Sequence, residues 1–89
     1  MDLQKKIDGD LREAIKNGDG IRSSTLKMLK SDITYEKAKK GEELNDEKVL
    51  EVIARAAKRR KESIEEFTKA NRADLADQEA KELVILETY

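Results

Sequence analysis

"VLEVIARAAKRRKESIEEF", residues 49–67, is the longest stretch of helical periodicity in the chain. Its apolar side chains recur at steps of three and four residues, as they do on a helix with one buried face. Asn45 precedes the stretch as a candidate N-terminal cap, and Asn71 follows it as a residue that tolerates the left-handed conformation of a helix end. The pattern therefore predicts a long helix over roughly residues 46–70. Its predicted buried positions are Leu50, Ile53, Ala57, Ile64 and Phe67.

Turn signals on either side of this helix divide the rest of the chain into three more helices. The sequence NGDG at residues 17–20 separates a first helix from a second, and Asp19 is placed to cap the second. Gly41 is a suitable terminator for the second helix, and Ala73 or Asp74 opens a fourth. Because short links favour antiparallel neighbours, we expect these helices to form a small antiparallel bundle. The apolar positions on the first two helices are Leu3, Ile7, Leu11, Ala14, Ile15, Ile21, Leu26, Met28, Leu29 and Ile33.

The composition supports an all-α fold with one thin core. Of the 89 residues, 37% are hydrophobic and 44% are charged, and 19 Lys and Arg nearly balance 20 Asp and Glu. Because the charge is balanced and the apolar residues are periodic, folding is favoured over disorder. The abundance of Ala, Glu, Lys, Leu and Arg favours long helices. We therefore expect an all-α bundle of about four helices, the third being longest, in a single helical domain over residues 1–89.

Several kinds of chemistry lack the residues they need. The sequence has no histidine and no cysteine, which removes disulfides, thiolate chemistry and the usual zinc and histidine-dependent catalytic sites. It has no apolar run of signal-peptide or membrane-spanning length, so we expect a soluble cytoplasmic protein. We expect no catalytic residues, no metal and no cofactor. The isoelectric point of about 5.6 argues against a strong general nucleic-acid binder.

The basic run KRRK at residues 58–61 does not form a single patch on the predicted long helix. Consecutive residues lie about 100° apart around a helix, so the four side chains spread over most of its circumference. Lys58 is expected to meet Glu62, and Lys61 is expected to meet Glu65, one turn away on an exposed face. Most of the run is therefore interpreted as a solvated, paired face.

Arg60 is the exception in this run because it falls on the apolar seam. It lies seven residues after Ile53 and four before Ile64. A charge there must extend to solvent, pair with a carboxylate or line a gap kept for a ligand. Counting levels in an up-and-down bundle makes Asp10 a possible partner. Structural pairing is favoured over a binding role, and both stay open.

The second helix carries a basic stripe with no acid among its members. Lysines with hydroxyls supply the charges and neutral donors that phosphate contacts need, although an ordinary solvated face gives the same pattern. No aromatic residue lies on the stripe to stack single-stranded bases. Asp32, on another side of the helix, is placed to meet Arg55 of the long helix. The stripe consists of Ser23, Lys27, Lys30, Thr34 and Lys37.

The C-terminal stretch ELVILETY, residues 82–89, is the most apolar part of the chain. It has no terminating glycine and no basic last turn, and Glu87 would lie at the unfavourable negative end of the helix dipole. The pattern is typical of a helix that continues, with an apolar face left to dock against something else. The candidate interaction residues are Leu83, Leu86 and Tyr89.

Three blocks in order resemble the N-terminal helical part of YqeY-type proteins: STLKMLKSDI at 24–33, KKGEELNDEKVLEVI at 39–53 and KRRKESIEEFTKANRADLADQEAKELVILETY at 58–89. The resemblance covers essentially the whole chain. It implies a small bacterial cytoplasmic protein, similar to the tail region of the B subunit of glutamine-dependent tRNA amidotransferase. It therefore implies a link to transfer RNA and to carbon–nitrogen ligation with glutamine as amide donor. The chemistry of such enzymes resides in other domains or subunits. In the family a second small helical domain follows the segment that ILETY begins, and the resemblance implies that this chain lacks that domain.

Two hypotheses about function follow. In the first, the chain is a non-catalytic module associated with tRNA, and its affinity falls steeply with salt. The expected phosphate contacts are Lys27, Lys30 and Lys37, with Arg59 or Lys61 as auxiliaries. In the second, the chain is a protein-docking module whose apolar end binds a second helical domain, an amidotransferase subunit or its own copy.

Overall fold

The computed structural model describes residues 2–89, and its helices follow the order expected from the sequence. They are α1 (Leu3–Lys16), α2 (Gly20–Lys40), α3 (Asp46–Lys69) and α4 (Ala73–Glu87). The all-α bundle of about four helices is confirmed, and α3 is the longest with 24 residues. No helix in this described part of the chain is long and apolar enough to cross a membrane.

The predicted helix ends are confirmed by their local geometry. The side chains of Asp19 and Asn45 each accept a hydrogen bond, at 3.0 and 2.9 Å, from the backbone amide three residues later. Gly41 and Asn71 both adopt the left-handed conformation, with φ of 69° and 59°. These four residues lie at the three turns that connect successive helices, from α1 through α4.

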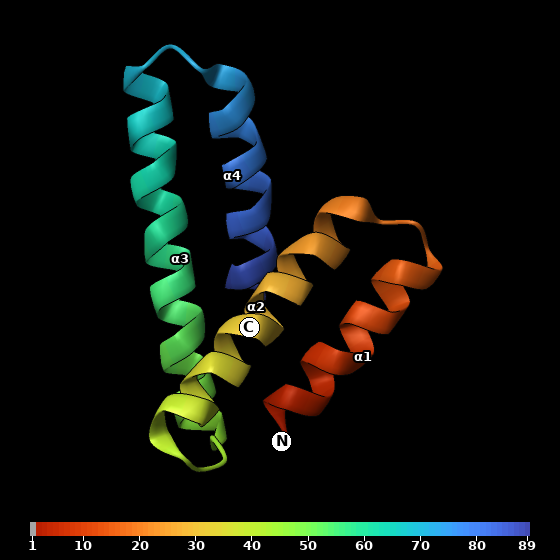
Figure 1. Cartoon of the computed structure of the whole chain (residues 1–89). Coiled ribbons are helices and arrows are strands. Elements are labelled where there is room, and N and C mark those ends of the chain that lie inside the picture. Colours follow the sequence, from red (N-terminus) through yellow and green to blue (C-terminus); the bar gives the residue numbers. More distant parts are fainter. Residues whose placement is uncertain (1) are drawn as a thin grey trace.

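The helices form two antiparallel hairpins that cross (Figure 1). The α3–α4 hairpin is the taller of the two, and the α1–α2 hairpin lies across its lower half. The turn between α3 and α4 therefore projects away from the rest of the chain. The molecule is correspondingly elongated, with extents of 42 × 30 × 19 Å.

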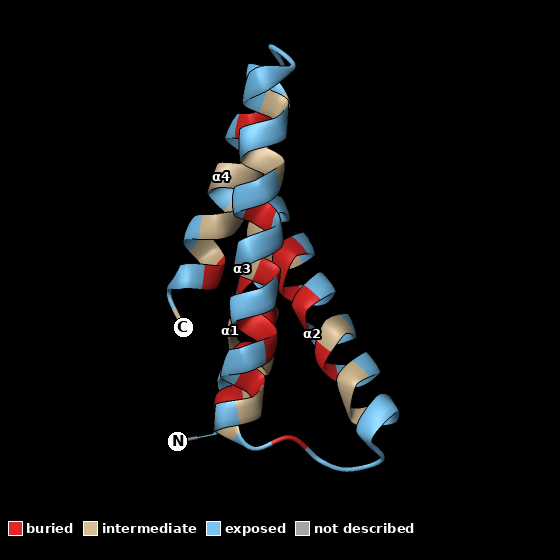
Figure 2. Cartoon of the chain, turned by 90° about the vertical axis from the view of Figure 1, so that its left-hand side faces the viewer, coloured by how far each residue is buried: buried red, intermediate tan, exposed pale blue. Residues whose placement is uncertain are grey.

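The core lies where the two hairpins cross, and all four helices contribute to it. Buried positions follow the inner sides of the helices, as the red bands in Figure 2 show. The link between α2 and α3 also contributes a side chain. The core cluster consists of Leu3, Ile7, Leu11, Leu26, Leu29, Ile33, Leu44, Val49, Val52, Ile53, Ala56 and Leu86.

The predicted buried seam of α3 is confirmed at Ile53, but the observed buried face is rotated around the helix from the predicted one. Leu50, assigned to the core, is 45% exposed, whereas Val49 and Val52 are buried. The reason is that α3 packs against neighbours on more than one side, so the buried arc centres about 100° away from Leu50. Ile64 and Phe67 are only half-buried because they lie on the projecting part of the hairpin. Three other positions assigned to apolar faces are also exposed, namely Ile15, Ile21 and Met28.

The C-terminal segment is part of the core rather than a free docking face. Leu86, predicted to be an exposed interaction residue, is only 1% exposed. The hydroxyl of Tyr89 donates to Asp10 Oδ2 at 2.6 Å and so fastens the end of the chain to α1. Leu83 is half-buried, while Val84 is 64% exposed. The apolar end of α4 therefore closes the bundle, and of its apolar side chains Val84 is the one mainly left to solvent.

Replacing Leu86 with alanine should lower the free energy of unfolding by about 2–5 kcal/mol, because a buried leucine leaves a cavity. The same change at Val84 should alter it by less than about 0.5 kcal/mol. Urea unfolding followed by circular dichroism compares the two variants on one helix. Equal stability of both variants would show that Leu86 does not join the core in solution.

Candidate functional site

The lysines proposed to contact phosphate lie on one side of α2, as predicted, but two of them are paired. Lys30 Nζ lies 2.8 Å from Asp8 Oδ1, and Lys37 Nζ lies 3.1 Å from Glu43 Oε1. Neither carboxylate belongs to α2: Asp8 lies on α1, and Glu43 lies in the link between α2 and α3. Lys27 is exposed and has no ion pair within the described part of the chain.

The inner edge of this lysine stripe borders α1. A small cavity of about 100 Å³ separates the two helices, and it is wide enough for a few water molecules. Its lining combines buried aliphatic side chains with polar ones. The lining residues are Gln4, Ile7, Asp8, Lys30, Ile33, Thr34 and Lys37.

The basic residues of α3 pair mainly with other helices. Arg59 Nη2 donates to Asp32 Oδ2 at 2.9 Å, and Arg55 Nη2 lies 3.4 Å from Glu36 Oε2. The predicted contact between Asp32 and Arg55 was therefore wrong by one helical turn. The crossing of α2 and α3 brings Arg59 to the level of Asp32, and sequence spacing does not determine that level.

The pairs expected along α3 itself are also replaced. Lys61 reaches Glu87 on α4 at 3.9 Å instead of Glu65. Within the described residues, Lys58 forms no ion pair with Glu62. Because α4 runs antiparallel beside α3, a carboxylate on the neighbouring helix takes the place of one on the next turn.

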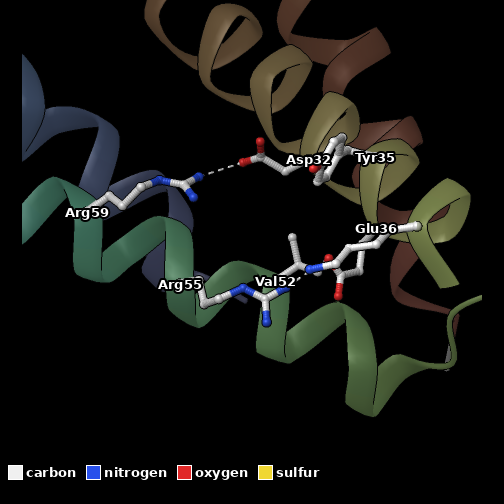
Figure 3. Close-up of a pocket in the computed structure, with 7 residues that line it drawn as sticks. Asp32, Tyr35, Glu36, Val52, Arg55 and Arg59 are labelled. Atoms are coloured by element: carbon white, nitrogen blue, oxygen red, sulfur yellow. Dashed lines mark hydrogen bonds and ion pairs between the residues drawn. The ribbon is translucent and has the colours of Figure 1, made fainter.

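A groove that the sequence did not predict lies between α2 and α3 (Figure 3). Its volume is about 300 Å³, and the two cross-helix ion pairs span it. Tyr35 lies on its α2 side and is 70% exposed. The available signal was a repeat of four residues on each helix, with acids at Asp32 and Glu36 and arginines at Arg55 and Arg59. The other lining residues are Lys39 and Val52.

Arg60 lies in the core seam, as predicted, but its partners are on α4. It is 7% exposed, and its Nε donates to Glu82 Oε1 at 3.2 Å. The same Nε lies 3.5 Å from Glu79 Oε2, and Nη2 donates to the sulfur of Met28 at 3.1 Å. Asp10, the expected partner, lies instead beside Tyr89. The closer packing of α4 against this side of α3 explains the difference.

The Arg60 cluster places one cation between two carboxylates, so it carries an excess negative charge. Glu79 Oε2 is buried and accepts no hydrogen bond. Burial raises the pKa of Glu79, the negative charge of Glu82 raises it further, and Arg60 lowers it. The geometry accounts for the buried guanidinium as a structural contact between α3 and α4.

The described residues contain no group of three or more acidic side chains arranged to hold a metal ion. Burial and the hydrogen bond to Asp10 raise the pKa of the Tyr89 hydroxyl, which therefore remains a protonated donor at neutral pH. The polar features best suited to contact a ligand are consequently the lysine stripe and the α2–α3 groove.

Comparison with known proteins places these features in a family. The sequence matches the family described as Yqey-like protein over residues 4–89. The chain belongs to the YqeY-like family. The resemblance proposed from three sequence blocks is thereby confirmed, and it extends through all four helices.

Several relatives of this YqeY-like chain come from fungi. Altered inheritance of mitochondria protein 41 of Kluyveromyces lactis is 38% identical over 81 residues, covering 90% of this chain and 44% of that protein. The protein of the same name from Lachancea thermotolerans is 31% identical over 90 residues, covering 100% and 48%. An uncharacterised Schizosaccharomyces pombe protein is 34% identical over 87 residues, covering 98% and 71%.

Two facts follow for this YqeY-like chain. It spans about half the length of the two mitochondrial relatives. The bacterial setting expected from the resemblance finds no support in these relatives, which come from three fungi.

Replacing Arg60 with methionine should lower the free energy of unfolding by about 3–5 kcal/mol, because it leaves two carboxylates without their cation. Adding Glu79→Gln and Glu82→Gln should recover part of that loss. Arg12→Met, at an exposed position of α1, serves as the control and should change little. If Arg60 were instead held in place for a ligand, Arg60→Met would leave the stability of the free protein intact.

Glu79→Gln should become more favourable relative to wild type as pH rises. Folding raises the pKa of Glu79 above its ordinary value of 4.5, so its stabilising contribution is complete below that value. That contribution is lost as the pH climbs through the folded-state pKa. The gap in unfolding free energy, measured in urea between about pH 4 and 7, should therefore widen in favour of the glutamine variant. Glu62→Gln, at an exposed position, should show no such trend; a gap at Glu79 that narrows with pH would contradict the assignment.

Proposed function

We propose that this chain is a non-catalytic module that binds transfer RNA and is accessory to glutamine-dependent amidotransferase systems. One observation carries the proposal: Lys27, Lys30 and Lys37 lie along one side of α2 at helical spacing. The identity of the RNA rests on the resemblance to the tail region of the amidotransferase B subunit. Arg59 and Lys61, predicted as auxiliaries, lie on α3 and pair with Asp32 and Glu87. The proposal therefore depends on the three lysines of α2 and not on these two residues.

The ion pairs on the lysine side are compatible with phosphate binding. Lys30 pairs with Asp8, and Lys37 pairs with Glu43, at partly exposed positions. Exposed ion pairs typically contribute only about 0–1 kcal/mol, so a phosphate group can displace these carboxylates at small cost. Lys27 has no carboxylate to displace. Release of counterions from RNA would supply most of the binding free energy.

The cytoplasm stays our proposal for where the protein acts. Two relatives have "mitochondrial" in their names, which describes those proteins. The mitochondrial interior is the location to test beside the cytoplasm, and both compartments suit a chain that has no cysteine.

A second function, protein docking, is favoured by one specific observation. Leu50 and Val84 are exposed aliphatic side chains, and a shallow hollow of about 290 Å³ lies beside Leu50 between α3 and the end of α4. The other residues that line this hollow are Ile53, Ala54, Ala57, Leu86, Glu87 and Tyr89. The partner proposed for it is a second helical domain, an amidotransferase subunit or another copy of the chain.

The RNA proposal is tested by titrating the chain with bulk tRNA at two salt concentrations. Three phosphate contacts at a slope of about 0.7–0.9 each predict that affinity falls about 20- to 40-fold between 50 and 200 mM salt. Changing Lys27, Lys30 and Lys37 together to glutamate should abolish binding at 50 mM salt, because three attractions become repulsions.

The matched control changes Lys16, Lys58 and Lys81 to glutamate, which alters the net charge equally at exposed positions of α1, α3 and α4. This control should retain most of the affinity. Equal losses in both triple variants would show that only net charge matters. Absence of binding by the unmodified chain at 50 mM would reject the RNA function and leave docking as the better account.

A further inference from the structure

Tyr35 exposes its aromatic ring in the α2–α3 groove. The chain has only three aromatic residues, and the other two are engaged: Phe67 is half-buried and Tyr89 is fastened to Asp10. Tyr35 is 70% exposed, and its hydroxyl makes no hydrogen bond within the described residues. A tyrosine ring left open in a groove offers a flat surface on which a nucleic-acid base can stack.

Arg55 and Arg59, on the α3 side of the groove, each have a carboxylate partner but keep N–H groups without one in the described residues. Arg59 uses Nη2 to bind Asp32, and Arg55 directs Nη2 toward Glu36. Their remaining N–H groups have no hydrogen-bond partner within the described residues. Each guanidinium is thus held in place by one carboxylate while most of its donors stay available. A planar guanidinium with free donors is well suited to bind a phosphate.

The charge of the groove is positive despite its carboxylates. Lys39 lines the groove without an ion pair in the described residues, and Lys40 lies 3.8 Å from Glu36. The groove is therefore lined by three cations, Lys39, Arg55 and Arg59, and by two carboxylates, and Lys40 lies just outside it. The buried Val52 supplies an apolar wall, and Asp32 and Glu36 can accept hydrogen bonds from the amino groups of a base.

We propose that the α2–α3 groove binds a nucleotide, with its base against Tyr35 and its phosphate on Arg55 and Arg59. Either a free nucleotide or an unpaired nucleotide of single-stranded RNA presents this combination of base and phosphate. The volume of about 300 Å³ admits one such unit rather than a duplex.

This site is separate from the lysine stripe and does not depend on it. Around α2, the buried face lies between the lysine stripe and the groove residues, and the centre of each set is about 100° from the centre of that face. Lys30 and Lys37 are on the α1 side, whereas Tyr35 and Lys39 are on the α3 side. The groove would therefore bind a nucleotide whether or not the lysines bind tRNA.

The test uses two probes, adenosine monophosphate and a fluorescent, 5′-phosphorylated RNA of about eight nucleotides. Ring resonances of Tyr35 are followed by NMR with the first probe, and fluorescence anisotropy is followed with the second. Tyr35→Ala should weaken binding about tenfold, as loss of one stacked base does, and Tyr35→Trp should preserve it. The double change Arg55→Gln and Arg59→Gln should also weaken binding about tenfold or more.

The controls remove similar groups elsewhere. Arg12→Gln with Arg72→Gln removes the same charge from exposed positions, and Val84→Ala trims an exposed apolar side chain. Both should bind like wild type, and circular dichroism should confirm that every variant is folded. Binding of the mononucleotide identifies a free nucleotide as sufficient, whereas binding of the oligonucleotide alone identifies RNA as the source.

Three results would overturn the assignment. The first is no binding of either probe at millimolar concentration. The second is equal binding by Tyr35→Ala and wild type, which would reduce the groove to a non-specific cationic surface. The third is displacement of the probes by a poly-glutamate peptide with the same affinity, which would identify the groove as a site for an acidic protein segment. Loss of tRNA binding in the lysine variant, with nucleotide binding intact, would separate this site from the proposed function.

Discussion

Leu86 lies where the two helical hairpins meet, and the architecture depends on its burial. It belongs to α4, yet the cluster that surrounds it draws on α1, α2 and α3. Among the described residues it is the one buried side chain that α4 contributes to this cluster, with Ile85 and Tyr89 partly buried beside it. The hydrogen bond from Tyr89 to Asp10 reinforces the same junction three residues later. Most apolar side chains of residues 82–89, the most apolar stretch of the sequence, therefore pack inside the bundle.

Arg60 marks the upper limit of that core. The buried positions of α3 run from Val49 to Arg60, and beyond Arg60 the hairpin is covered on one side only. A buried guanidinium is tolerated at such a boundary because α4 supplies carboxylates and α2 supplies the sulfur of Met28. The charged contact joins α3 to α4 at this level.

The sequence predicted the elements better than their contacts. Helix ends depend on local chemistry, so Asn45 and Gly41 could be assigned from residue type alone. The buried face of α3 could not be assigned as well, because Leu50 and Val49 are both apolar and the crossing of the hairpins decides between them. The partner of Arg60 was missed for the same reason. Sequence spacing relates residues on one helix, whereas ion pairs between helices depend on the crossing geometry, which no local pattern determines.

This dependence on tertiary geometry also separates the two candidate binding regions. Four basic side chains of α3 pair with carboxylates of α2 or α4, namely Arg55, Arg59, Arg60 and Lys61. On α2, Lys27 and Lys39 form no ion pair within the described residues, and they lie on opposite sides of its buried face. A ligand that engaged Lys27 and Tyr35 together would have to pass around the exposed side of the helix. A folded RNA is too broad and stiff for the groove beside Tyr35, whereas a single unpaired nucleotide fits it. In the two proposals, the two sides of α2 therefore bind different forms of the same chemistry: phosphates of a folded RNA on one side, and a base with its phosphate on the other.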